Sequence, residues 1–62
     1  MNVSCLLHEH KQEIFQRISD YREQTFYNFC LCVNEIINEH HPDIVAVDRL
    51  HSHKLWKERI GG

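Results

Sequence analysis

The sequence predicts a mainly α-helical fold, in which one long amphipathic helix is followed by a shorter C-terminal element. Apolar residues recur at three-, four- and seven-residue steps over residues 7–37, and this spacing buries one face of an α-helix. Neither glycine nor proline interrupts the chain before Pro42. We therefore expect a long helix over about residues 5–41, a turn at 41–43 and a second element over about 44–60, within one small domain of residues 1–62.

A break near the middle of the long helix is the alternative, because Asp20 and Glu23 have the spacing of a capping pair at a helix start. Such a break would normally reset the rotation of the helix that follows. Phe26 and Phe29 instead continue the apolar stripe that Ile14 begins. The continuous helix is therefore preferred.

The predicted helix ends before Pro42, because proline disfavours helical geometry in the preceding residue and lacks a backbone N–H donor. The β-branched apolar run at residues 44–47 fits two structures. A proline followed by an acidic residue starts helices, so residues 43–59 fit a second helix that closes a helical hairpin. The same run is typical of a buried strand, which would need a partner strand from a second copy. The helix is preferred over the strand.

A helix of this length, about 45 Å at 1.5 Å per residue, presents more apolar surface than the short C-terminal element covers. A chain of 62 residues also buries only a modest core by itself. We therefore expect the bundle to be completed by a homodimer or higher oligomer, which presents either its groove or its tail to another protein. The predicted interface consists of Ile14, Phe15, Ile18, Arg22, Phe26, Phe29, Val33, Ile36 and Ile37.

Arg22 projects near the centre of this stripe. Either its alkyl stem covers apolar surface while the guanidinium reaches water, or it pairs with an acidic residue across the interface.

Charge divides the chain into two parts. Residues 1–48 carry a net charge of −5 with neutral histidines, and the tail from Arg49 carries +3. An acidic helix with a basic tail suits head-to-tail or antiparallel association. The tail also supports a third hypothesis, nucleic-acid binding through phosphate contacts and stacking, although the acidic remainder would repel the polymer. Its residues are Arg49, Lys54, Trp56, Lys57 and Arg59.

Histidine is unusually frequent, with six residues arranged as pairs at positions 8 and 10, 40 and 41, and 51 and 53. Residues two apart on a helix point to nearly opposite sides, so the first pair cannot share a metal ion there. On an extended segment the last pair would face the same way, and a histidine from the middle pair would join it around zinc if the tail folds back. The alternative function is therefore transition-metal binding through His40, His41, His51 and His53, although no cofactor is the preferred expectation.

The stretch of 11 residues from His41 to His51 resembles the helix-to-strand step in the cytoplasmic domain of cation diffusion facilitators. That resemblance implies a strand after Pro42 and favours the metal hypothesis. The sequence departs from the family because the membrane helices and later strands are absent. The chain is therefore not assigned to it.

Several function classes are not supported. Both glycines, Gly61 and Gly62, are terminal, so there is no glycine-rich phosphate loop, and no catalytic constellation is evident. Apolar runs are too short to cross a bilayer, and the N-terminus lacks the pattern of a secretory signal. Cys30 and Cys32 diverge on a helix and are expected to pack as small buried side chains. We therefore predict a small, non-catalytic, cytoplasmic protein-interaction or regulatory module that acts through an apolar helix face.

Overall fold

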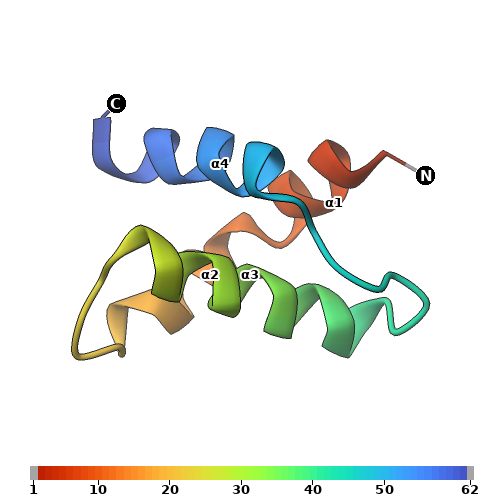
Figure 1. Ribbon diagram of the computed structural model, residues 1–62, viewed down its shortest axis with the longest axis horizontal. Helices are drawn as coiled ribbons and strands as arrows, with labels where there is room; N and C mark the ends of the chain where they lie inside the picture. The colour runs from red at the N-terminus through yellow and green to blue at the C-terminus, as the bar shows by residue number, and fades with distance from the viewer. Residues whose placement is uncertain (1, 62) are drawn as a thin grey trace.

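The computed structural model describes residues 2–61 and consists, over that range, of four α-helices without a strand. The prediction of a mainly helical fold is confirmed. The helices are α1 (Val3–Glu9), α2 (Lys11–Ser19), α3 (Phe26–His40) and α4 (Arg49–Gly61). They form two layers, with α1 and α4 lying over α2 and α3 (Figure 1). Helix α3 contacts each of the other three helices and is the centre of the fold.

The prediction of one continuous helix over residues 5–41 is wrong, because this segment forms three helices. The first interruption is His10, whose φ of −104° and ψ of 15° lie outside the α-helical region. Its backbone N–H still donates to the carbonyl of Leu6 at 3.1 Å, and its own carbonyl accepts from Ile14 at 3.0 Å. The hydrogen bonds of His10 itself are therefore kept where the chain changes direction.

The second interruption is the loop of residues 20–25, close to the break that the sequence offered as an alternative. The cap is Thr25 rather than Asp20: the Thr25 hydroxyl accepts a hydrogen bond from the N–H of Asn28 at 3.2 Å. The side-chain amide of Asn28 donates in turn to the carbonyl of Glu23 at 2.6 Å and closes the loop. Polar side chains thus start α3 without a glycine or proline.

Burial explains why the helix breaks. The loop lets α2 fold back against α3 in antiparallel orientation, so the apolar stripe is covered by the chain itself (Figure 1). Fully burying one large aliphatic or aromatic side chain contributes about 1.5–3 kcal/mol, which outweighs the few helical hydrogen bonds lost at the loop. The buried apolar residues are Leu6, Leu7, Ile14, Ile18, Phe29, Cys32, Val33, Ile36, Ile37, Val47 and Leu55.

The predicted stop before Pro42 agrees with the structure, because α3 ends at His40. Residues 44–48 are neither the helix nor the strand that the sequence allowed. This segment is held by one side chain: the amide oxygen of Asn34 accepts from the N–H of Val47 at 2.6 Å. Val47 is buried while Val45 is 98% exposed, so only part of the apolar run enters the core.

Helix α4 therefore begins at Arg49, later than the predicted start near residue 44. The carboxylate of Asp48 accepts a hydrogen bond from the N–H of His51 at 3.0 Å and caps its first turn. Within residues 2–61, none of the helices combines the length and apolarity needed to cross a lipid bilayer.

Candidate functional site

Six of the nine residues predicted to form an interface lie inside this fold. Each has at most 1% of its surface exposed, so a partner cannot contact it while the fold is intact. Phe15 and Phe26 are half-buried, and Arg22 is exposed in the loop before α3. The six buried residues are Ile14, Ile18, Phe29, Val33, Ile36 and Ile37. The face of α3 opposite these buried residues remains accessible.

A groove of about 350 Å³ lies along that face, between α3 and the chain that enters α4. Tyr27 and Leu31 border it, and they are 68% and 46% exposed. These two residues are one helical turn apart and share one side of α3. The volume falls within the range of pockets that bind ligands or single large side chains. We call this site the α3 groove; its lining residues are Phe26, Tyr27, Cys30, Leu31, Asn34, Val47 and Arg49.

Arg49 is the polar group that the α3 groove leaves free for a ligand. Within the part of the chain that the structure describes, its guanidinium forms no ion pair. The other polar side chain, Asn34, is already used: it accepts from Val47 and donates to the carbonyl of Cys30 at 2.9 Å. Burial raises the pKa of the Cys30 thiol, so this wall is neutral. The groove thus combines apolar walls with one unpaired cation.

Two residues of the predicted basic tail, Trp56 and Arg59, make contacts within the fold. The indole of Trp56 packs at an angle against Phe26 and Phe29, with ring centroids 5.9 and 5.2 Å apart. The guanidinium of Arg59 lies over the same indole at 5.9 Å and donates a hydrogen bond to Gln24. Trp56 therefore acts as core packing and is not a free platform for stacking on bases. Lys54 and Lys57 are exposed on α4.

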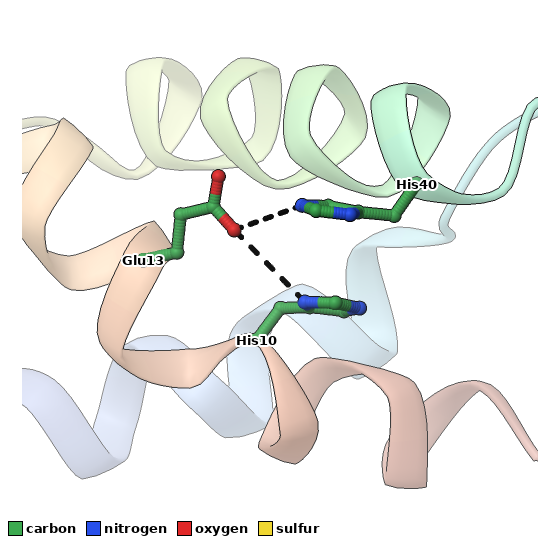
Figure 2. Close-up of side chains that lie close together, drawn as sticks. All are labelled: His10, Glu13 and His40. Atoms are coloured by element: carbon green, nitrogen blue, oxygen red, sulfur yellow. Dashed lines mark hydrogen bonds and ion pairs between the residues drawn. The ribbon is translucent and has the colours of Figure 1, made fainter.

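The structure brings one of the four predicted metal ligands, His40, next to His10 and Glu13, neither of which was among the predicted ligands. His40 ends α3 and faces His10 and Glu13 at the start of α2 (Figure 2). Its Nε2 lies 2.9 Å from Glu13 Oε1, and His10 Nδ1 lies 4.0 Å from the same oxygen. The two imidazole rings are stacked, with centroids 4.3 Å apart. We call His10, Glu13 and His40 the His–Glu cluster.

The other predicted metal ligands do not belong to this cluster. His41 is adjacent, with its ring centroid 5.7 Å from that of His10. On α4, the Nδ1 of His51 lies 3.0 Å from the carboxylate of Asp48. The His53 ring packs edge-on against Phe26. The C-terminal pair is therefore engaged in contacts of its own.

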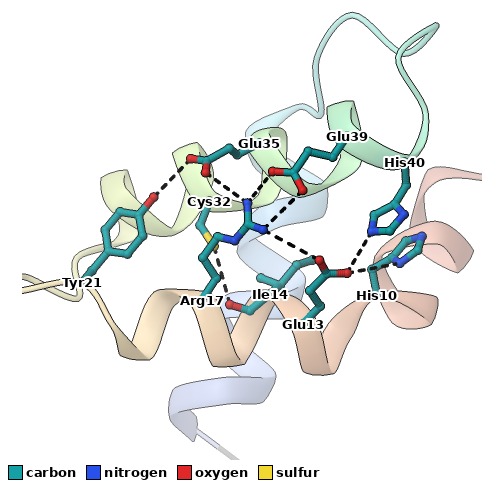
Figure 3. A network of polar contacts seen from close by, with 9 residues as sticks. All are labelled: His10, Glu13, Ile14, Arg17, Tyr21, Cys32, Glu35, Glu39 and His40. Carbon is teal, nitrogen blue, oxygen red and sulfur yellow. Dashed lines mark hydrogen bonds and ion pairs between the residues drawn. The ribbon is translucent and has the colours of Figure 1, made fainter.

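Glu13 also connects the His–Glu cluster to a set of charges along α2 and α3 (Figure 3). Arg17 lies one turn further along α2, and its guanidinium is 3.8 Å from Glu13, 3.0 Å from Glu35 and 2.7 Å from Glu39. The hydrogen bond from Arg17 lowers the pKa of Glu39. Tyr21 donates a hydrogen bond to Glu35 at 3.4 Å. One guanidinium against three carboxylates leaves this network with a net charge of −2.

A sequence signal for part of the His–Glu cluster existed. His10 and Glu13 are three residues apart, which places them on the same side of a helix. The third member, His40, follows Glu13 by 27 residues. On a continuous helix the two would be about 40 Å apart. The residues come together only because α3 folds back against α2.

No family model matches this chain, and neither the curated proteins nor the solved structures include a match. Function therefore has to be inferred from the chain's own residues.

Proposed function

We propose that this protein is a non-catalytic interaction module whose α3 groove binds an acidic, amphipathic segment of another protein. The observation that carries the proposal is the combination of Tyr27 and Leu31, two exposed apolar side chains, with the unpaired guanidinium of Arg49 in one groove.

The apolar part of the groove supplies the binding energy in this proposal. Burying a large apolar side chain contributes about 1.5–3 kcal/mol, and interfaces concentrate their energy in a few such anchors. Tyr27 and Leu31 present two exposed apolar side chains one turn apart on the same helix. Such a row of apolar side chains suits a polypeptide segment with an apolar residue of its own.

Arg49 supplies the specificity. A guanidinium pairs with a carboxylate through two parallel hydrogen bonds, which fixes the orientation of the partner. The favoured segment therefore carries a large apolar residue for the groove and an aspartate or glutamate close to it in sequence.

The same lining argues against catalysis in the groove. Its only thiol belongs to Cys30, whose raised pKa disfavours the reactive thiolate. None of the seven lining residues is a histidine or a carboxylate that would act as a general base. Binding is thus the activity that these side chains support.

Selection from a displayed peptide library tests the proposal. Peptides enriched on the wild-type protein and depleted on Leu31→Asp are expected to pair a large apolar residue with a nearby carboxylate. Arg49→Glu should weaken their binding by at least about tenfold, because a charge pair becomes a repulsion. Ile60→Asp is the matched control, since Ile60 is 58% exposed but is not part of the groove lining.

Two results would contradict the proposal. One is a set of peptides whose binding is unchanged by Leu31→Asp and by Arg49→Glu. The other is a concentration-dependent dimer in sedimentation experiments that Leu31→Asp abolishes, because the groove would then belong to a second copy of this chain.

A further inference from the structure

The His–Glu cluster lies apart from the α3 groove and has a different chemistry. It offers two imidazoles and one carboxylate, a donor set that zinc accepts in proteins. The side chains of His10, Glu13 and His40 are 16%, 41% and 42% exposed, so an ion from solvent can reach them. Their ligand atoms all lie within 4.8 Å of one another. We propose that this cluster binds a divalent transition-metal ion of the zinc type.

The distances between the ligand atoms of the His–Glu cluster are close to those between the ligand atoms of a zinc site. Ligand atoms at ordinary zinc distances in a tetrahedral site are about 3.4 Å apart. The two separations from Glu13 Oε1, 2.9 Å to His40 and 4.0 Å to His10, lie on either side of this value. The imidazole planes are only 14° from parallel, so the rings must tilt for both lone pairs to meet at one ion.

The fold permits this tilt. His40 is the last residue of α3, and His10 is the junction between α1 and α2, so both rings lie at helix ends. The second ring nitrogen of His10, Nε2, is buried and has no hydrogen-bond partner among residues 2–61. Turning this ring therefore breaks no hydrogen bond at that nitrogen.

Charge also favours a cation at this position. Arg17 is shared among Glu13, Glu35 and Glu39, and the excess negative charge is not neutralised within this network. Arg17 approaches Oε2 of Glu13, while Oε1 faces the histidines. This ion pair leaves Oε1 available as the ligand atom and places a positive charge behind the carboxylate, the side from which outer-shell groups commonly orient metal ligands.

A bound ion would join the start of α2 to the end of α3. Since the ion binds the folded chain and not the unfolded one, the melting temperature should rise with ion concentration. This effect does not depend on what occupies the α3 groove.

The test uses the reduced protein of residues 1–62 with Zn²⁺ and Co²⁺ as probes. Native mass spectrometry is expected to show one Zn²⁺ per chain, and Co²⁺ should develop the visible absorption of a tetrahedral site. Glu13→Gln and His40→Gln should each lower the affinity by at least about tenfold and remove the zinc-dependent rise in melting temperature. His51→Gln and His53→Gln are the matched controls and should bind as the wild type does.

Side-chain NMR provides a readout that does not depend on variants. Zinc should shift the ring resonances of His10 and His40 and leave those of His53 in place. Circular dichroism of each variant tests whether the helices are retained. The side chains of Glu13 and His40 are 41% and 42% exposed, so retention is the expected result for these two variants.

The proposal is overturned if Glu13→Gln and His40→Gln bind Zn²⁺ as tightly as the wild type. It is also overturned if Co²⁺ shows the near-ultraviolet charge-transfer bands of thiolate ligation, which would assign the ion to cysteine. Arg49→Glu and Leu31→Asp should leave metal binding unchanged, so the fate of this proposal and that of the groove are distinguishable.

Discussion

The guanidinium of Arg17 on α2 donates hydrogen bonds to both carboxylate oxygens of Glu39 on α3, at 2.7 and 3.3 Å. It also bonds Glu35 one turn earlier on α3, at 3.0 Å. A single side chain thus connects the two helices whose antiparallel packing forms most of the core (Figure 3).

This contact predicts a loss of stability in acid. Arg17 lowers the pKa of Glu39 from its ordinary value of 4.5, so the unfolded chain takes up a proton more readily than the folded one. The stabilisation is therefore complete above that value and is lost as the pH falls through the lower folded pKa. The melting temperature, followed by circular dichroism across a pH series, should fall less steeply in Arg17→Gln than in the wild type. If the melting temperatures of the two proteins fall in parallel as the pH is lowered, the prediction is wrong. Glu23→Gln, in the exposed loop, is the control and should follow the wild type.

Thr25→Ala distinguishes the observed fold from a continuous helix. As the N-cap of α3, Thr25 should contribute about 1 kcal/mol to the free energy of unfolding, and alanine removes its hydroxyl. In the interior of a long helix the same change would stabilise, because alanine is the better helix former. Urea denaturation shows directly whether Thr25→Ala lowers or raises the free energy of unfolding. Thr25→Ser keeps the acceptor and should remain close to the wild type.

Phe29 and Tyr27 lie on opposite faces of α3 and should respond differently to truncation. Phe29 is fully buried, so Phe29→Ala should cost about 3–5 kcal/mol. A chain of this length is stabilised by roughly 3–9 kcal/mol in total, so much of the variant should be unfolded at room temperature. Tyr27→Ala, at a residue 68% exposed, should stay within about 0.5 kcal/mol. Equal melting temperatures for the two variants would show that the assignment of faces is wrong.

The three cysteines should react in order of exposure. Cys5 is exposed, whereas Cys32 is fully buried and burial raises its pKa to about 11. Iodoacetamide at neutral pH is therefore expected to modify Cys5 first and Cys32 only after denaturant is added. Mass spectrometry of digested protein locates the modified residues. Early modification of Cys32 in native protein would mean that the contact between α2 and α3 opens easily.

Much of the core was visible in the sequence. The period of the apolar residues identified Ile14, Ile18, Phe29 and Val33 as members of one buried set, and all four are buried. The spacing of the apolar residues shows which of them share one face of a helix, but it does not show what covers that face. A partner chain and a second helix of the same chain satisfy the pattern equally well.

The breaks in the helix were harder to predict because their signals are local and weak. Thr25 caps α3 through one side-chain hydrogen bond, in a segment without glycine or proline. The apolar spacing continues unchanged across the loop, and in the fold the apolar faces of α2 and α3 pack against each other. The continuous apolar spacing therefore fits two helices that fold back on each other as well as it fits one straight helix.

The candidate sites were the least predictable part. Arg49 and Leu31 are 18 positions apart, and they share a groove because the segment before α4 lies against α3, where Asn34 bonds the backbone of Val47 and the Val47 side chain is buried. The predicted metal site, in which His40 or His41 joins His51 and His53, assumed that the tail folds back onto the end of α3. In the structure α4 begins later, and His51 is held by Asp48.

By itself, the sequence determined helical content, the identity of most core residues and the end of α3 before Pro42, because each follows from local spacing or from the backbone of one residue. Only the tertiary structure decided that the chain buries its own stripe. It also decided that His40 meets His10 and Glu13, and that Tyr27 and Leu31 remain on the surface. The physical reason is that burial is non-local: hydrophobic free energy depends on area removed from water and is indifferent to which segment removes it.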